Sequence, residues 1–118
     1  MFVRIMNNII AEEIGLVVSG ERFEPMLFVG DELRLAREYT FGVSERGQKE
    51  IRLRFASRSS DKSCISELGC IKVSGFSNTT PNAISVILSI MAWEDGSLLM
   101  KWTDSVSSAL IDSSFLSD

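Results

Sequence analysis

Residues 39–55, YTFGVSERGQKEIRLRF, decide how the whole chain is interpreted. From Glu50 to Phe55, apolar residues alternate with charged ones, and this period of two is typical of a strand with one buried face. Residues 39–43 carry aromatic and β-branched side chains, which fit a pleated sheet. The polar residues 44–48 between them include a glycine. The stretch therefore predicts a β-hairpin with a long loop, and the apolar face of that hairpin needs a cover.

Strand patterns separated by turn residues extend from this stretch in both directions. Before it, residues 14–18 alternate, Gly20 lies in a turn, and residues 23–28 return, with Pro25 indicating a sheet edge or a bulge. After it, residues 84–91 alternate most regularly, and a second strand returns beyond a glycine turn. The expected strands cover residues 9–10, 14–18, 23–28, 39–43, 50–55, 70–73, 84–91 and 98–102.

The segments between these strands carry weaker patterns. Residues 33–37 are expected to be extended, although their composition also suits a helical turn. Residues 57–67 form the clearest loop. Residues 109–111 are a candidate final strand, and the polar residues 112–118 are expected to fray.

Together these patterns predict an all-β fold. Short strands between regular turn signals, with no convincing helix, indicate an antiparallel β-sandwich of about eight strands. A chain of 118 residues is long enough for one domain and too short for two, so we expect a single domain over residues 1–118.

The composition argues against several kinds of active site. The chain has no histidine, which removes histidine-based triads, metal sites and proton shuttles together. Its two cysteines, Cys64 and Cys70, cannot form a four-ligand zinc site, and their spacing fits no redox motif. Paired acids at residues 12–13 and 94–95 fall at a strand start or in a turn, where carboxylates are usually solvated. We therefore expect no enzymatic activity, no metal and no cofactor.

The charge pattern argues against nucleic acid as a partner. The net charge is −4, and the local cluster of basic residues is interrupted by acids, as on a solvated strand face. The cluster consists of Arg46, Lys49, Arg52, Arg54, Arg58 and Lys62.

The N-terminal residues and the cysteines indicate the cellular compartment of the protein. Residues 1–11 are too short, and too often interrupted by polar residues, to be a signal peptide or a membrane span. Two cysteines without a signal peptide favour a reducing compartment, so a cytoplasmic location without a membrane partner is expected.

Several motifs in this order resemble the β-sandwich substrate-binding subdomain of the seventy-kilodalton heat-shock chaperones, the DnaK type. EIGLVVSGERFEPML, residues 13–27, resembles the first hairpin of that family, and YTFGVSERGQKEIRLRF resembles its third and fourth strands. Leu68-Gly69, Gly75 and then IMAWEDGSLLM, residues 90–100, resemble its LGxF…G…FDIDxDGIL run. IDSSFLSD, residues 111–118, resembles the end of its last strand. The likeness covers nearly the whole chain with few identities.

The departures from the family limit what the resemblance implies. The family's NTTIP is replaced by residues 30–34, and its GERxxAxDN loop by residues 58–67. Its nucleotide-binding domain and helical lid have no counterpart in these 118 residues, which are either a fragment of a longer protein or a stand-alone module. The resemblance therefore implies passive, chaperone-like binding of unfolded or extended hydrophobic peptides, without an ATP-driven switch.

Carried over by position, the resemblance implies a pocket for one apolar side chain of the peptide. The six corresponding positions are all apolar, and they are Leu16, Val18, Phe41, Ile51, Leu53 and Val86. By periodicity alone these residues are better explained as ordinary core, and only the resemblance favours a pocket. Two further positions, Ser19 and Ser44, correspond to an arch over the peptide backbone, where the family prefers larger or more apolar residues. A serine arch predicts weaker retention of the peptide, or another use for the groove.

An interaction or assembly module is the alternative function. Ile87, Met91 and Trp93 are expected on the outer face of the sandwich, where they could support dimerisation or the docking of a partner strand. Self-association through an edge strand, or through the C-terminal tail at residues 109–116, belongs to the same hypothesis.

Overall fold

The computed structural model describes residues 1–116 and builds them from β-strands and connecting turns. Within residues 1–116, no helix is long and apolar enough to cross a membrane. The strands are β1 (Ile5–Met6), β2 (Ile9–Ile10), β3 (Glu13–Val18), β4 (Arg22–Leu27), β5 (Arg37–Phe41), β6 (Glu50–Arg58), β7 (Ile65–Ser74), β8 (Val86–Ala92), β9 (Leu98–Asp104) and β10 (Asp112–Leu116).

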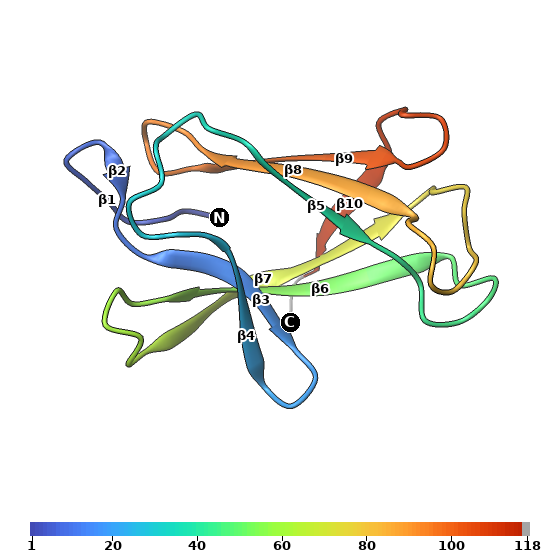
Figure 1. The fold of residues 1–118 in the computed structure, drawn as a ribbon, viewed down its shortest axis with the longest axis horizontal. Helices are drawn as coiled ribbons and strands as arrows, with labels where there is room; N and C mark the ends of the chain where they lie inside the picture. Colours follow the sequence, from blue (N-terminus) through green and yellow to red (C-terminus); the bar gives the residue numbers. More distant parts are fainter. Residues whose placement is uncertain (117–118) are drawn as a thin grey trace.

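Two antiparallel sheets lie face to face and form a sandwich (Figure 1). The larger sheet has five strands in the order β10-β7-β6-β3-β4, and the smaller has three in the order β5-β8-β9. The short strands β1 and β2 pair with each other in a separate hairpin at one end. This architecture confirms the predicted all-β sandwich.

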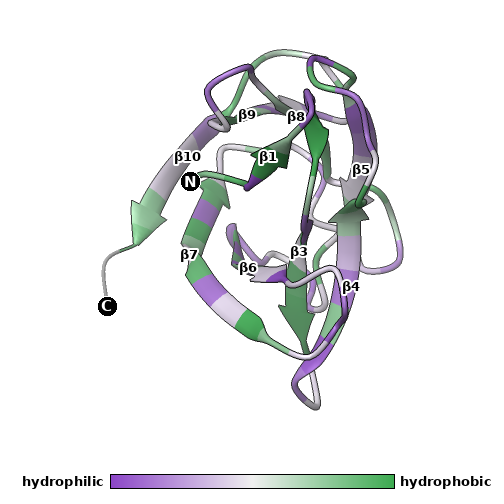
Figure 2. Cartoon of the chain, turned by 90° about the vertical axis from the view of Figure 1, so that its left-hand side faces the viewer, coloured by the Kyte–Doolittle hydropathy of each residue, from purple (hydrophilic) through white to green (hydrophobic). Residues whose placement is uncertain are grey.

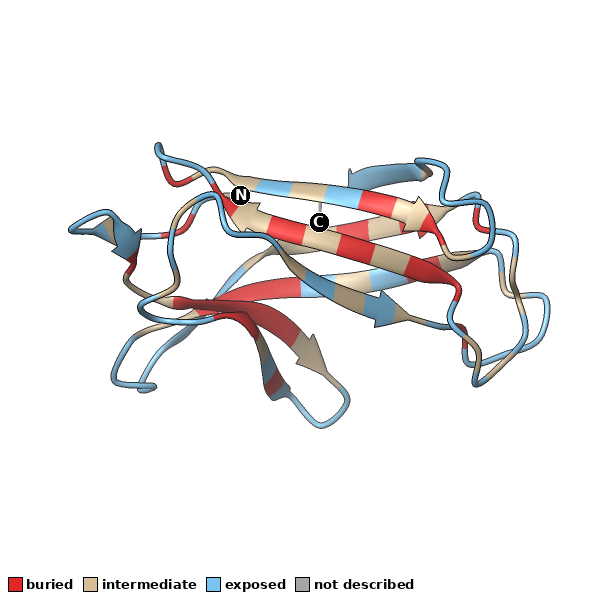
Figure 3. Ribbon diagram, turned by 45° about the horizontal axis from the view of Figure 1, so that its top comes forward, coloured by how far each residue is buried: buried red, intermediate tan, exposed pale blue. Residues whose placement is uncertain are grey.

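The core lies between the two sheets. Along β8, buried Val86, Leu88 and Ile90 alternate with half-buried residues, as the period of a strand requires (Figure 3). They pack against inward-facing residues of the larger sheet, such as Ile14 and Phe55, in one contiguous cluster. One hydrophobic core therefore serves both sheets, and their apolar faces cover each other.

The predicted hairpin over residues 39–55 is wrong, although both of its strands exist. β5 pairs with β8 in the smaller sheet, whereas β6 pairs with β3 and β7 in the larger one. Residues 42–49 thus carry the chain from one sheet to the other, with Val43 buried between them. The apolar faces of β5 and β6 point at each other across the core rather than lying side by side.

Two further predictions, for the loop at 57–67 and for residues 33–37, are also corrected. β6 continues to Arg58 and β7 begins at Ile65, so the expected loop at 57–67 shrinks to the turn at 59–64. Residues 33–37 are not uniformly extended, because the backbone turns at Arg34, where φ is +66°, before β5 begins.

The C-terminal prediction is corrected too. Of residues 109–111 only Leu110 makes a β-bridge, whereas Asp112–Leu116 form a full strand against β7 where fraying was expected. Residues 117–118 of that predicted tail lie outside the described part of the chain.

The β3–β4 hairpin matches its sequence pattern closely. Gly20 adopts a positive φ of 78° in the turn, and β4 is an edge strand of its sheet. The pairing shifts register between Ile14 and Gly15, opposite Leu27 and Pro25, so Pro25 lies at both an edge and a bulge, as predicted.

A buried carboxylate organises the end of the sandwich beyond β9. Asp104 is 2% exposed and accepts hydrogen bonds from the N–H and hydroxyl of Ser77, each at 2.8 Å. It also accepts bonds from the N–H of Ser107 at 3.1 Å and its hydroxyl at 2.9 Å. These donors, first those of Ser77, lower the pKa of Asp104 from 3.8 to about 2. The Asp104 carboxylate therefore joins the loops that contain Ser77 and Ser107 to the end of β9.

We expect Asp104→Asn to lower the free energy of unfolding at neutral pH. The carboxylate accepts four hydrogen bonds, and the neutral amide that replaces it cannot accept all four. Since the folded pKa of about 2 lies below the ordinary 3.8, the carboxylate stabilises the fold above pH 3.8. That contribution is lost as the pH falls through about 2. In urea titrations, the difference in free energy of unfolding between wild type and variant should become smaller as the pH falls from 3.8 to about 2.

Asp95→Asn is the matched control. Asp95 accepts its side-chain hydrogen bonds from Ser97, within one exposed turn, so its replacement should cost less. Equal losses for the two variants would contradict the bridging role of Asp104.

Candidate functional site

The two sides of the sandwich are closed differently (Figure 2). On one side the chain leaves β9, bonds back to it through the Ile111 N–H and the Trp102 carbonyl at 3.1 Å, and then continues as β10 on the larger sheet. On the other side, β4 and β5 are the last strands of their respective sheets. We call this β4–β5 side the seam.

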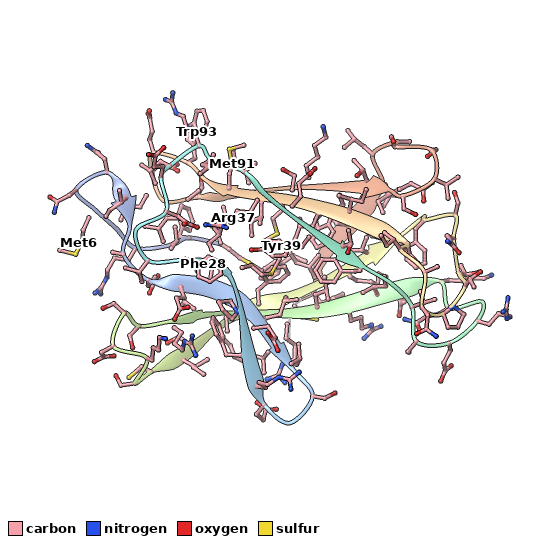
Figure 4. The ribbon with its side chains drawn as sticks, in the orientation of Figure 1. Met6, Phe28, Arg37, Tyr39, Met91 and Trp93 are labelled. Atoms are coloured by element: carbon pink, nitrogen blue, oxygen red, sulfur yellow. The ribbon has the colours of Figure 1, made fainter. Side chains whose placement is uncertain are left out.

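Two interactions hold the seam together (Figure 4). At one end, the Arg37 guanidinium donates two hydrogen bonds of 2.8 Å to the Asp31 carboxylate and lies 4.9 Å from the centre of the Phe28 ring. Further along, the Tyr39 hydroxyl donates to the carbonyl oxygen of Met26. These contacts fix β5 to β4 and to the turn that follows β4.

The ionisable groups of the seam respond to this packing. Burial opposes the charge of the Asp31 carboxylate, but the hydrogen bonds from Arg37 and the Phe28 N–H outweigh it and lower its pKa. Burial raises the pKa of the Tyr39 hydroxyl. At neutral pH the seam therefore has an ionised pair at one end and a neutral hydroxyl donor in the middle.

Beside these contacts the seam contains an apolar cavity of about 300 Å³, which we call the seam cavity. Its walls come from β3, β4 and β5, and most of them are apolar. The lining residues are Leu16, Val18, Glu24, Pro25, Met26, Tyr39, Thr40 and Phe41. Behind it, the ring of Phe41 lies 6.2 Å from the ring of the buried Trp102, at a tilt of 42°. The cavity is thus bounded by a fixed aromatic wall on the smaller sheet.

A second cavity, of about 460 Å³, lies at the turn between β3 and β4. Leu16 and Val18 line it as well, so these two residues separate the turn cavity from the seam cavity. Its remaining walls are more polar and come from the turn and from β6. They are Val17, Ser19, Gly20, Glu21, Arg52, Leu53 and Arg54.

The structure brings together some of the six pocket residues expected from the sequence. Leu16, Val18 and Phe41 meet around the seam cavity, and Leu53 joins the first two around the turn cavity. Ile51 and Val86, at 7% and 1% exposure, belong to the core. Four of the six residues therefore border a cavity, and one of these four, Leu16, is also 7% exposed and belongs to the core as well.

The two expected arch serines lie in different loops. Ser19 is exposed in the β3–β4 turn, on the wall of the turn cavity. Ser44 is exposed between β5 and β6, where its N–H and hydroxyl donate to Gln48 Oε1 at 3.2 and 3.1 Å. Ser44 is thus engaged within its own loop.

Sequence reasoning missed the residues that close the seam. Met26 and Tyr39 line the cavity and bind each other, but the assumed β5–β6 hairpin placed Tyr39 beside the wrong strand. One signal was present, because Pro25 already marked β4 as an edge. Only the register of β5 on β8 shows which second edge faces it.

Part of the basic cluster noted in the sequence is paired with acidic residues. Arg54 is held between Glu67 and Glu21, the latter at 3.2 Å, and the hydrogen bonds that its guanidinium donates to these carboxylates, first to Glu67, raise its pKa. Arg58 pairs at 2.8 Å with the buried Glu13. These pairs leave a mixed-charge surface on the larger sheet rather than a positive stripe.

Within residues 1–116, no three Cys, Asp or Glu side chains gather closely enough to hold a metal ion. A scan against models of protein families found no match, and a search of curated proteins also found none.

We expect Tyr39→Phe to lower the free energy of unfolding by about 1 kcal/mol, because the Met26 carbonyl loses its side-chain donor. The loss should be local, so amide hydrogen exchange should accelerate in β4 and β5 and leave β8 unchanged. Thr40→Val, which changes an exposed neighbour on the same strand, is the control. Uniform acceleration over all strands would contradict a local tie at the seam.

Proposed function

We propose that the seam binds a short, extended peptide segment and receives one of its large apolar side chains, without catalysis. The observation that carries this proposal is an apolar cavity lying between two strands that each end a sheet. An edge strand offers backbone donors and acceptors to an added chain, and a neighbouring pocket selects a side chain. Few other ligands use both features at once.

The size of the cavity favours a side chain over a whole small molecule. Pockets for drug-sized ligands span roughly 300–1,000 Å³. The seam cavity, at about 300 Å³, is at the bottom of that range and has one carboxylate, Glu24, among mostly apolar walls. A leucine- or phenylalanine-sized group fits this description, whereas a nucleotide or sugar would leave its polar atoms without partners.

The two edges are not equally suited to pairing. β4 has Pro25, which lacks an N–H, and its Met26 carbonyl already accepts the Tyr39 hydroxyl. β5 has no proline, and its five residues keep an unbroken register on β8. We therefore assign the peptide backbone to the edge of β5, with its apolar side chain directed between Val18 and Phe41.

The expected affinity is modest. Burying one leucine contributes about 1.5–3 kcal/mol, and each backbone hydrogen bond contributes roughly 1 kcal/mol. Association opposes these gains by at least ~4 kcal/mol. A dissociation constant of roughly 10 µM or weaker follows. Release should be fast, because no residue within 1–116 forms a lid over the cavity.

The resemblance to the substrate-binding subdomain of the DnaK-type chaperones supports the same class of ligand. It adds a cellular role, the transient holding of unfolded or extended hydrophobic segments. The serines at the arch positions, with Ser44 bonded within its own loop, agree with weak retention. Free Cys64 and Cys70 suit a reducing compartment, and we place this activity in the cytoplasm.

The test is a titration of a labelled, leucine-centred heptapeptide with this protein, followed by fluorescence anisotropy. We expect saturable binding in the micromolar range. Val18→Asp should weaken binding at least about tenfold, because a carboxylate then replaces an apolar wall of the cavity. Val18 is half-buried at the end of its strand, which makes this variant safer for the fold than a change at Leu16.

Val106→Asp is the matched control, because it makes the same substitution at a residue that is 68% exposed in the turn after β9. In a Trp93→Phe background, Trp102 is the sole tryptophan and should report peptide binding through Phe41. Binding that is absent at roughly millimolar protein, or that Val18→Asp and Val106→Asp alter equally, would reject the seam as the site.

A further inference from the structure

The four outer edges of the two sheets are protected to different degrees. β4 carries Pro25 and a bulge, and the first residue of β5, Arg37, is tied to the turn after β4 by its pair with Asp31, which leaves the rest of that edge to the peptide proposed above. β9 is covered at one end by the bridge from Phe2 to Ser97 and at the other by the bridge from Leu110. Proline, bulges, charges and covering segments are the usual means by which proteins block unwanted strand pairing.

The edge of β10 has no proline, no bulge and no covering segment within residues 1–116. Its five residues pair with β7 in an unbroken register, and its only charged residue is Asp112 at the start. It ends the larger sheet, on the side opposite the seam (Figure 2). Its outer row of backbone donors and acceptors is therefore regular and open to another strand.

The apolar content of β10 is also left uncovered. The Phe115 ring lies over Gly69 of β7, where φ is +143° and any Cβ would overlap the ring. The far end of the ring is thus packed against Gly69, but the side chain remains 59% exposed. A large aromatic residue on an open edge gains burial when a second strand arrives beside it.

We propose that β10 pairs antiparallel with the β10 strand of a second copy of this chain, joining the two larger sheets into one continuous sheet. The register that pairs all five residues has its two-fold axis at Ser114. It places Asp112 opposite Leu116 of the second copy. The contact is isologous, so it closes at a dimer. It is independent of the peptide site at the seam.

This register is self-complementary. No charged residue faces a like charge, because Asp112 lies opposite a leucine and the axis passes through a serine. Phe115 faces Ser113 of the second copy, and the two phenylalanines become diagonal neighbours on one face of the sheet. Diagonal neighbours are about 7–8 Å apart, within reach for aromatic rings. Each ring then covers surface that the monomer leaves exposed.

The test is sedimentation velocity of the full chain from roughly 10 µM to 1 mM. We expect a reversible monomer–dimer equilibrium. Ser114→Lys should weaken the dimer roughly fivefold or more, because it places two like charges opposite each other at the axis. Ser60→Lys makes the same change in the exposed β6–β7 turn and should leave the equilibrium as in wild type. Thermal melts establish that both variants fold.

A second measurement places the axis. In a Cys64→Ser, Cys70→Ser background, Ser114→Cys should form a covalent dimer with a short bismaleimide, whereas Ser60→Cys should not. A protein that remains monomeric at 1 mM would overturn the proposal. A dimer that is equally sensitive to lysine at residues 60 and 114, or equally cross-linked through cysteine there, would overturn it too.

Discussion

The fold depends on the burial of two apolar sheet faces against each other. β5 and β6 are consecutive strands, yet they belong to opposite sheets, so residues 42–49 must cross the sandwich. This crossing directs Phe41 and Ile51 into the same interior from opposite sides. The hydrophobic effect then favours closure of the sheets over their whole length. The contacts at the sheet edges form between strands whose positions the core determines. The seam is a place where this closure is incomplete.

The seam shows how a polar contact can define a binding cavity. Tyr39 reaches across from β5 to the Met26 carbonyl, and this bond holds the strands close without filling the space beside them. Leu16 and Val18 form the floor of that space and also the wall toward the turn cavity. A peptide in the seam cavity would therefore contact Leu16 and Val18, which also line the turn cavity. The β3–β4 hairpin thus supplies residues to both cavities.

Much of the architecture was predictable because alternation reports which residues face the core. It located β3, β8 and β9 well, and Pro25 identified an edge. Alternation does not report which strands are neighbours, however. For this reason β5 and β6 were predicted to pair with each other, whereas they belong to different sheets. β10 was missed for a related reason. Its residues are polar apart from Phe115 and Leu116, and its partners, residues 70–74 of β7, are far away in sequence. Four of the six pocket residues border cavities, but Tyr39 and Met26 required the three-dimensional register.

The bonding of Asp104 also constrains how this sequence can vary. Its carboxylate requires donors from Ser77 and from Ser107, which lie in separate connections of the chain. Surface loops usually accept insertions and substitutions independently of one another. Here a change of length in either loop would withdraw donors from an anion that is 2% exposed, and the other loop would lose its anchor as well. Homologous chains that retain the aspartate should therefore vary these two loops together rather than separately.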